Sequence, residues 1–149
     1  MKQILFALVL TLCVSCSKDK EVDYIAQNEK EISAYVAKNN LTVQRSASGL
    51  YYVVSDEGTG EQPITTSNVT VAYKGYFTNG SVFDQSKAEG ISFNLQEVVK
   101  GWTEGITYFK EGGSGILLVP AHLGYGNNDN KGIPGGSVLI FEVKLISIN

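Results

Sequence analysis

Alternation of apolar and polar residues predicts a β-rich domain over the C-terminal two thirds of the chain. Period-two patterns bounded by turn-forming residues are typical of half-buried strands. They occur at residues 49–54, 69–77, 81–84, 91–95, 115–119 and 138–148. In the last segment Phe141, Val143 and Leu145 alternate with charged Glu142 and Lys144, so one face of the sheet is expected to be buried and the other exposed to solvent.

The dipeptide Asn79-Gly80 separates two of these predicted strands. Both central residues of a type I′ turn need positive φ, which asparagine and glycine tolerate better than other residues do. The sequence therefore predicts a two-residue hairpin with a type I′ turn at this point.

A helix is predicted from Asp23 to Asn40, with Asp23 as its N-cap. The apolar residues that fall near one face of this helix are Val22, Ile25, Ile32 and Val36. An isolated helix of this length is marginal in water, so we expect it to pack against its own domain. A helix that serves dimerisation or binds a partner protein is the alternative.

A second, shorter helix is predicted between residues 98 and 109. Val98, Trp102, Ile106 and Phe109 have helical spacing there, and Gly112-Gly113 ends the pattern. Strands dominate the chain and one short helix is inserted between them, which indicates an α+β fold built on an antiparallel sheet.

The first sixteen residues have the pattern of a signal peptide. Lys2 precedes an apolar run, Ile4 to Val14, that is too short to cross a membrane as a stable helix. The sequence Cys13-Val14-Ser15-Cys16 resembles a bacterial lipobox, in which the last cysteine carries the lipid. We therefore predict lipidation of Cys16, with ordinary secretion or an uncleaved anchor as the alternatives.

These patterns divide the chain into a signal peptide (1–16), a tether (17–22), an N-terminal helix with its linker (23–47) and a main domain (48–149). The charged tether resembles that of outer-membrane lipoproteins of the Bacteroidetes type. We expect a protein of the cell envelope, anchored by its lipid to the outer membrane and facing either the periplasm or the cell surface. Each acyl methylene buried in the bilayer would contribute about 0.8 kcal/mol to this anchoring.

Composition and charge exclude several classes of function. The chain has 149 residues, of which 43% are apolar and 18% charged, as is usual for one globular domain. A formal net charge of −3 argues against a surface for nucleic acid. One histidine, together with two cysteines that both lie in residues 1–16, leaves too few ligands for a zinc or iron site. We expect no metal and no cofactor.

Two polar features between residues 120 and 132 have simple interpretations. Residues 127–132 superficially resemble a calcium loop, but Lys131 stands where a ligand is required, so we expect a polar loop tip. His122 has no evident acidic partner and is expected to be a surface or hydrogen-bonded loop residue. Neither feature predicts hydrolytic or metal chemistry.

Two other residues are better candidates for a functional site. Asp84 directly follows Phe83 in an apolar stretch, where a carboxylate is costly to bury unless a donor such as a tyrosine hydroxyl bonds it. Tyr125 lies between two glycines, which places an aromatic side chain in a turn instead of a core strand.

Six segments of the chain form an ordered set of motifs. They are Val71-Ala72-Tyr73-Lys74-Gly75-Tyr76, Gly80-Ser81-Val82-Phe83-Asp84, Glu97-Val98-Val99-Lys100-Gly101-Trp102, Val119-Pro120-Ala121-His122-Leu123-Gly124-Tyr125-Gly126, Gly132-Ile133-Pro134 and Leu139-Ile140-Phe141-Glu142-Val143-Lys144-Leu145. In their order and spacing these segments resemble the FKBP family of peptidyl-prolyl cis-trans isomerases. The resemblance covers about residues 48–149. It implies a curved antiparallel sheet wrapped around a short helix, with the active pocket between that helix and the concave face of the sheet.

The resemblance also implies which residues form the site. Those that would take part in catalysis are Tyr73, Phe83, Asp84 and Tyr125. Those that would bind the substrate are Ile91, Val98, Val99, Trp102, Ile133 and Phe141. Trp102 would form the floor of the pocket, Tyr125 and Ile133 would close its rim, and Asp84 would accept a hydrogen bond from Tyr73.

The implied activity is isomerisation of X-Pro bonds, which assists the folding of exported proteins. The partners implied are proline-containing polypeptide clients, the membrane that receives the lipid, and macrolide inhibitors as further ligands of the pocket. One alternative is a noncatalytic binding module or chaperone with the same fold. Another is an accessory lipoprotein of a cell-surface machine such as that of gliding motility.

Overall fold

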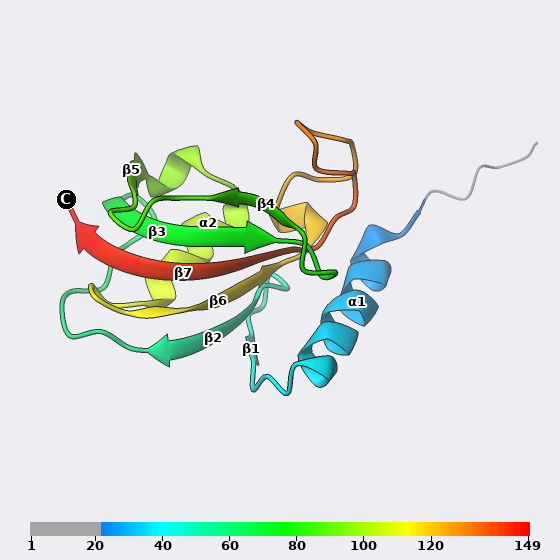
Figure 1. Cartoon of the computed structure of the whole chain (residues 1–149), viewed down its shortest axis with the longest axis horizontal. Coiled ribbons are helices and arrows are strands. Elements are labelled where there is room, and N and C mark those ends of the chain that lie inside the picture. The colour runs from blue at the N-terminus through cyan, green and yellow to red at the C-terminus, as the bar shows by residue number, and fades with distance from the viewer. Residues whose placement is uncertain (1–21) are drawn as a thin grey trace, which may run out of the picture.

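The structure is a computed structural model that describes residues 22–149 (Figure 1). Its helices are α1 (Tyr24–Lys38) and α2 (Lys100–Gly105), with short 3-10 helices η1 (Leu95–Glu97), η2 (Ile106–Tyr108) and η3 (Ala121–Leu123). Its strands are β1 (Gln44–Arg45), β2 (Tyr51–Asp56), β3 (Asn68–Tyr76), β4 (Val82–Gln85), β5 (Ile91–Asn94), β6 (Ser114–Val119) and β7 (Leu139–Ile148). The predicted signal peptide, the lipidation site Cys16 and residues 17–21 of the tether lie outside the described residues.

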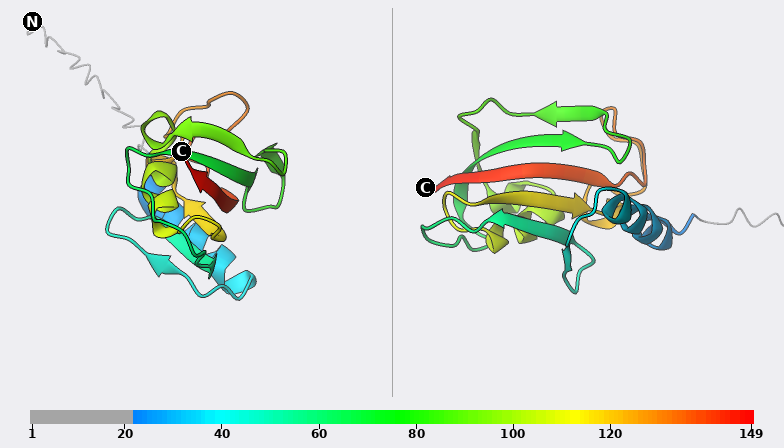
Figure 2. Two further views of the ribbon diagram at one scale, coloured as in Figure 1. Left: turned by 90° about the vertical axis from the view of Figure 1, so that its left-hand side faces the viewer. Right: turned by 60° about the horizontal axis from the view of Figure 1, so that its bottom comes forward.

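The strands form one seven-stranded antiparallel sheet in the order β1-β2-β6-β7-β3-β4, with β5 paired to β3. The sheet curves around α2 (Figure 2). The prediction of a curved antiparallel sheet wrapped around a short helix is therefore confirmed. Along β7 the alternation is also as predicted, because Phe141, Val143 and Leu145 are buried while Glu142 and Lys144 are exposed.

The core lies between α2 and the concave face of the sheet. Trp102 of α2 and Ile106 of η2 pack with Leu117 of β6 and Phe141 of β7 in one buried cluster. Gly105 permits this close approach, because a Cβ atom at Gly105 would lie 2.7 Å from the side chain of Leu117. The helix can therefore rest directly on the sheet.

The second helix is shorter than predicted. It begins at Lys100 rather than Val98, because Val98 and Val99 are extended, with ψ angles of 174° and 146°. The chain before them turns through η1, where the Asn94 side chain caps the backbone N–H of Gln96 at 2.9 Å. The helical spacing of apolar residues did not reveal this break, because the two valines of an extended segment can face the same side of the domain as the apolar residues of the helix that follows.

The predicted type I′ turn at Asn79-Gly80 is wrong. Only Gly80 has positive φ, at 88°. The turn spans four residues: the N–H of Gly80 donates to the carbonyl of Phe77, and the N–H of Phe77 donates to the carbonyl of Ser81, each at 2.9 Å. The Asn79 side chain accepts from the N–H of Ser81 instead, so one left-handed glycine suffices and the strand pairing shifts by a bulge.

Helix α1 begins as predicted and packs against its own domain. Asp23 caps it by accepting a hydrogen bond from the N–H of Ala26 at 3.2 Å. Ile32 is fully buried in a cluster with residues of β6 and of the loop before β7. The predicted apolar face is only partly correct, because Val22 and Ile25 are 50% and 59% exposed, and the buried position one turn before Ile32 belongs to a polar residue, Asn28.

Polar contacts also attach α1 to the sheet. Glu29 forms an ion pair with Arg45 at 2.7 Å and accepts a hydrogen bond from the hydroxyl of Tyr51, also at 2.7 Å. The hydrogen bonds from Tyr51 and Arg45 hold the pKa of Glu29 below its usual value. Within residues 22–149 neither helix has the length and apolar character that a membrane span requires.

Candidate active site

A cavity of ≈ 290 Å³ opens between α2 and the concave side of the sheet. Nine of the predicted site residues line it: Tyr73, Phe83, Asp84, Ile91, Val98, Val99, Trp102, Tyr125 and Phe141. The volume lies near the lower end of the range of about 300–1,000 Å³ for small-ligand sites. A cavity of this size can hold a single ring together with the amide groups next to it.

The walls of the cavity are aromatic rings in edge contact. Trp102 is 5% exposed, and its ring centroid lies 5.0 Å from that of Tyr73 and 5.2 Å from that of Phe141, at interplanar angles of 86° and 83°. Phe83 meets Phe141 in the same way, at 5.5 Å and 88°. Edge-to-face packing of this kind fixes ring orientations, so the cavity is preformed.

A glycine on β3 allows Phe83 to reach this position. A Cβ atom at Gly75 would lie 2.7 Å from the Phe83 ring and 3.0 Å from Phe141. The two rings therefore occupy space that any other residue at this position would take. The sequence pattern supplies the glycine, and the pairing of β3 with β4 and β7 brings it beneath the rings.

Asp84 forms the polar edge of the cavity. Its Oδ2 accepts a hydrogen bond from the hydroxyl of Tyr73 at 2.6 Å, as predicted. The carboxylate is exposed, because β4 is short and its second face is open to solvent. Burial, together with the bond to Asp84, raises the pKa of Tyr73 far above its usual value, so the hydroxyl remains a donor at neutral pH.

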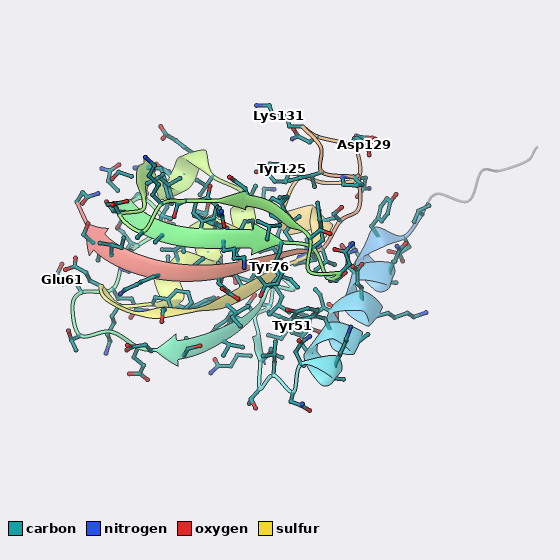
Figure 3. The ribbon with its side chains drawn as sticks, in the orientation of Figure 1. Tyr51, Glu61, Tyr76, Tyr125, Asp129 and Lys131 are labelled. Atoms are coloured by element: carbon teal, nitrogen blue, oxygen red, sulfur yellow. The ribbon has the colours of Figure 1, made fainter. Side chains whose placement is uncertain are left out.

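Tyr125 stands at the rim and Ile133 does not. Tyr125 is 42% exposed and comes from the loop between η3 and β7 (Figure 3). Ile133 is 8% exposed and belongs to the buried core, outside the lining of the cavity. Paired backbone hydrogen bonds between Asn130 and Ile133, each 2.9 Å long, fold the loop back and account for this inward position.

The structure adds two lining residues that the sequence interpretation missed, Phe93 and Glu97. Phe93 packs on Trp102 with ring centroids 5.5 Å apart. Its alternation with Ile91 could have indicated a strand face, but Ile91 also reaches the cavity, at its open edge. No local pattern distinguished Glu97 from other exposed acidic residues.

The remaining polar features have the simple roles expected of them. His122 is exposed, and its Nε2 lies 2.8 Å from the carbonyl oxygen of Ser48. Asp129 accepts a hydrogen bond from the N–H of Gly135 within the polar loop. Among residues 22–149 no group of three or more histidine, cysteine, aspartate or glutamate side chains is placed to hold a metal ion.

Comparison with known sequences identifies the relatives of the chain. The family model described as FKBP-type peptidyl-prolyl cis-trans isomerase matches residues 59–146. FkpA of Escherichia coli strain K12, named an FKBP-type peptidyl-prolyl cis-trans isomerase, is 39% identical over 127 residues, which cover 83% of this chain and 47% of that protein. FkpA of Buchnera aphidicola subsp. Schizaphis graminum is 44% identical over 110 residues, which cover 71% and 43%. The chain thus matches somewhat less than half the length of these relatives.

Solved structures give the same result. The crystal structure of FkpA from Escherichia coli matches with a TM-score of 0.75 and 39% identity, over 84% of this chain and 61% of that one. A peptidyl-prolyl cis-trans isomerase from Pseudomonas syringae pv. tomato matches with a TM-score of 0.74 and 28% identity, over 85% and 93%. AtFKBP13 matches with a TM-score of 0.66 and 30% identity, over 73% of this chain and 100% of that one.

Proposed function

The chain belongs to the FKBP-type peptidyl-prolyl cis-trans isomerases, and from this premise we propose that its aromatic cavity isomerises X-Pro bonds in polypeptide clients. The observation that carries the proposal is the cavity itself, a preformed group of aromatic rings with one carboxylate–phenol pair at its edge. Such a site can take a prolyl ring and leave the preceding carbonyl near polar groups. Assistance to the folding of exported proteins is the role that follows.

The chemistry requires no bond to be made or broken other than the partial double bond of the amide. Rotation about that bond costs about 18–20 kcal/mol in water. Twisting makes the carbonyl less dipolar and the nitrogen more basic, so a dry cavity stabilises the twisted amide relative to the planar one better than water does. Among the residues that line the cavity in the described part of the chain there is no serine, cysteine or histidine, and none is needed.

The nine predicted residues that line the cavity each have a role in this proposal. Trp102 is the floor on which the prolyl ring rests, and Phe83 and Phe141 hold the ring from the sides. The hydroxyl of Tyr125 donates to the client's carbonyl oxygen. Asp84, fixed by Tyr73, helps to orient the twisted carbonyl. The smaller side chains Ile91, Val98 and Val99 contact the residues next to the proline, and none of these groups transfers a proton.

Exchange NMR on a short X-Pro peptide tests the activity. The uncatalysed exchange takes tens of seconds, so a sub-stoichiometric amount of the chain should accelerate it measurably. An unchanged exchange rate in the presence of the folded chain would refute the isomerase proposal. If the peptide then shifted resonances of the cavity residues, the chain would be a binding module or chaperone that holds prolyl segments.

We further propose that the chain is a lipoprotein of the cell envelope, anchored through Cys16. The support is the sequence of the leader, and the five residues 17–21 would then separate the lipid from the described domain. At about 3.3–3.6 Å per extended residue, this tether spans less than about 20 Å. The domain would thus work close to the membrane face that holds the lipid.

The anchor is tested by cell fractionation. Cys16→Ser should move the protein out of the membrane fraction, because the acylated thiol is gone. Cys13→Leu, which changes the other leader cysteine and keeps Cys16, is the matched control and should stay with the membranes. If Cys16→Ser also remained with the membranes, a different anchor would hold the protein and the lipidation proposal would be wrong.

A further inference from the structure

Asn28 of α1 is the one polar side chain that is fully buried among residues 22–149, with 1% of its surface exposed. Its Nδ2 donates to the carbonyl oxygen of Gly136 at 2.9 Å, and its Oδ1 accepts from the N–H of Ala121 at 2.8 Å. A buried amide is costly unless it is hydrogen-bonded, and here both ends of the side chain are bonded. Its partners lie 108 and 93 positions away in the sequence, so the contact is wholly tertiary.

These two partners are the ends of the loop that carries Tyr125. Within the loop, the N–H of Gly126 donates to the carbonyl of Ala121 at 2.8 Å, and the N–H of Gly136 donates to the carbonyl of Gly126 at 2.9 Å. Asn28 closes this chain of hydrogen bonds into a ring of four residues. Tyr125 directly precedes Gly126 and is therefore held by the ring.

A second residue of α1, Tyr24, packs against the same loop. Gly136 has a φ of 76°, and a Cβ atom there would lie 1.9 Å from the ring of Tyr24. The Tyr24 ring thus lies directly on the backbone of Gly136. In Figure 1, α1 lies beside the segment that leads from η3 to β7. The position of the loop is set by the helix as well as by the sheet.

We propose that Asn28 is a positioning residue of the active site, which holds the loop from Ala121 to Gly136 so that Tyr125 faces the cavity. The proposal rests on the proposed isomerase activity and on the role of Tyr125 in it. It makes α1 a working part of the catalytic unit, although the helix lies outside residues 59–146, which the family model matches.

The geometry determines which kinetic parameter should change. Tyr125 is at the rim with 42% of its surface exposed, so less packing holds it in place than holds the buried rings of the cavity. The hydrogen bonds of Asn28 go to Gly136 and Ala121, neither of which lines the cavity, so binding of the prolyl ring should persist without it. Loss of Asn28 should therefore lower kcat by about five- to tenfold and leave KM within about twofold.

A double-mutant cycle with the full chain distinguishes positioning from a general loss of stability. Asn28→Ala is measured in the normal background and again in a Tyr125→Ala background. If Asn28 acts through Tyr125, its substitution should change kcat by less than twofold once the tyrosine is gone. If the double variant lost kcat by the product of the two single-variant factors, the two residues would act independently and the proposal would be overturned.

The matched control is Asn39→Ala. Asn39 is the same residue type at the other end of α1, where its Nδ2 donates to the carbonyl of Tyr35 at 2.9 Å on the exposed surface. It has no contact with the loop, so kcat should stay within twofold. A fall in kcat as large as that for Asn28→Ala would assign the effect to the helix in general and refute a specific role of Asn28.

Hydrogen exchange gives a measurement that does not depend on catalysis. The amide protons of Gly126 and Gly136 should exchange at least tenfold faster in Asn28→Ala and at the normal rate in Asn39→Ala. Unchanged exchange would refute the positioning proposal even if the normal chain proved to have no isomerase activity, so the two failures are distinguishable.

A third variant covers the case in which Asn28→Ala fails to fold. Asn28→Leu keeps the volume of the side chain, so it leaves no cavity and buries no charge, and it loses both hydrogen bonds to the loop. Exchange should rise at Gly136 and kcat should fall by about five- to tenfold. Normal exchange and normal kcat in this variant would also overturn the proposal.

Discussion

Removal of the indole at position 102 is the most direct test of the cavity. Trp102→Ala deletes the floor on which the prolyl ring is proposed to rest, and it leaves the surrounding rings of Tyr73, Phe93 and Phe141 without their common partner. Both stability and activity should change. The two effects have different sizes and can be separated by a control.

The structure sets the size of the loss in stability. Truncation of a buried tryptophan to alanine costs about 3–5 kcal/mol. Trp102 is 5% exposed and one side of it borders an open cavity, so water can enter the space that the indole leaves. We therefore expect a loss at the lower end of this range, about 3 kcal/mol, measured by urea denaturation.

The loss in activity follows from the contact between the two rings. One face of a prolyl ring against the indole buries roughly 60–90 Å² of apolar surface, worth about 1.5–2.2 kcal/mol at about 25 cal/mol per Å². Loss of this contact should lower kcat/KM about 10- to 40-fold. Exchange NMR on an X-Pro peptide, under conditions where the variant is still folded, measures the change.

Phe109→Ala is the matched control for lost stability. Phe109 is fully buried in the same core but does not line the cavity, and its truncation should cost about 3–5 kcal/mol without a change in kcat/KM beyond twofold while the chain is folded. A folded Trp102→Ala chain whose kcat/KM stayed within twofold of normal would remove Trp102 from the site. A loss of activity in Phe109→Ala equal to that in Trp102→Ala would show that stability alone governs the rate.

Three further predictions concern other contacts. Asp84→Leu should lower kcat/KM severalfold in the peptide assay and leave the urea midpoint nearly unchanged, because the carboxylate is exposed; normal turnover would make it a structural residue. Gly105→Ala should destabilise the fold by about 1–3 kcal/mol in urea, since the added methyl meets Leu117 at 2.7 Å. The hydrogen bond from Tyr51 lowers the pKa of Glu29 in the folded chain. The ionised Glu29 therefore contributes its full stabilisation above the usual pKa of 4.5, and this stabilisation is lost as the pH falls through the lower pKa of the folded state. Amides of α1 should exchange faster with solvent below that pH.

Much of the fold follows from local patterns in the sequence. Alternation located each of the principal strands to within a few residues, because a half-buried strand must present apolar groups to one face only. The cap at Asp23 and the burial of Ile32 were also predictable, since both depend on residues within one or two turns of each other. The hairpin turn was not, because Asn79 and Gly80 suit several turn types and strand pairing decided among them.

The site was predicted in its composition and only partly in its arrangement. The bond from Tyr73 to Asp84 was expected, and the structure contains it. Ile133 was expected at the rim, but paired bonds within its loop turn it into the core. Phe93 and Glu97 were missed because lining a cavity depends on how far the sheet curves, which no local pattern records.

The sequence by itself therefore determined the family, the strands and the aromatic set from which a cavity could be built. These depend on residue type and on spacing along the chain. Only the tertiary structure decided which of those rings meet, where the second helix begins and what holds the loop of Tyr125. The clearest case is Asn28, a polar residue that resembles any surface asparagine in the sequence and that bonds two backbone groups 93 and 108 positions away. Contacts of that kind arise from packing of distant segments, and local hydrophobic patterns carry no information about them.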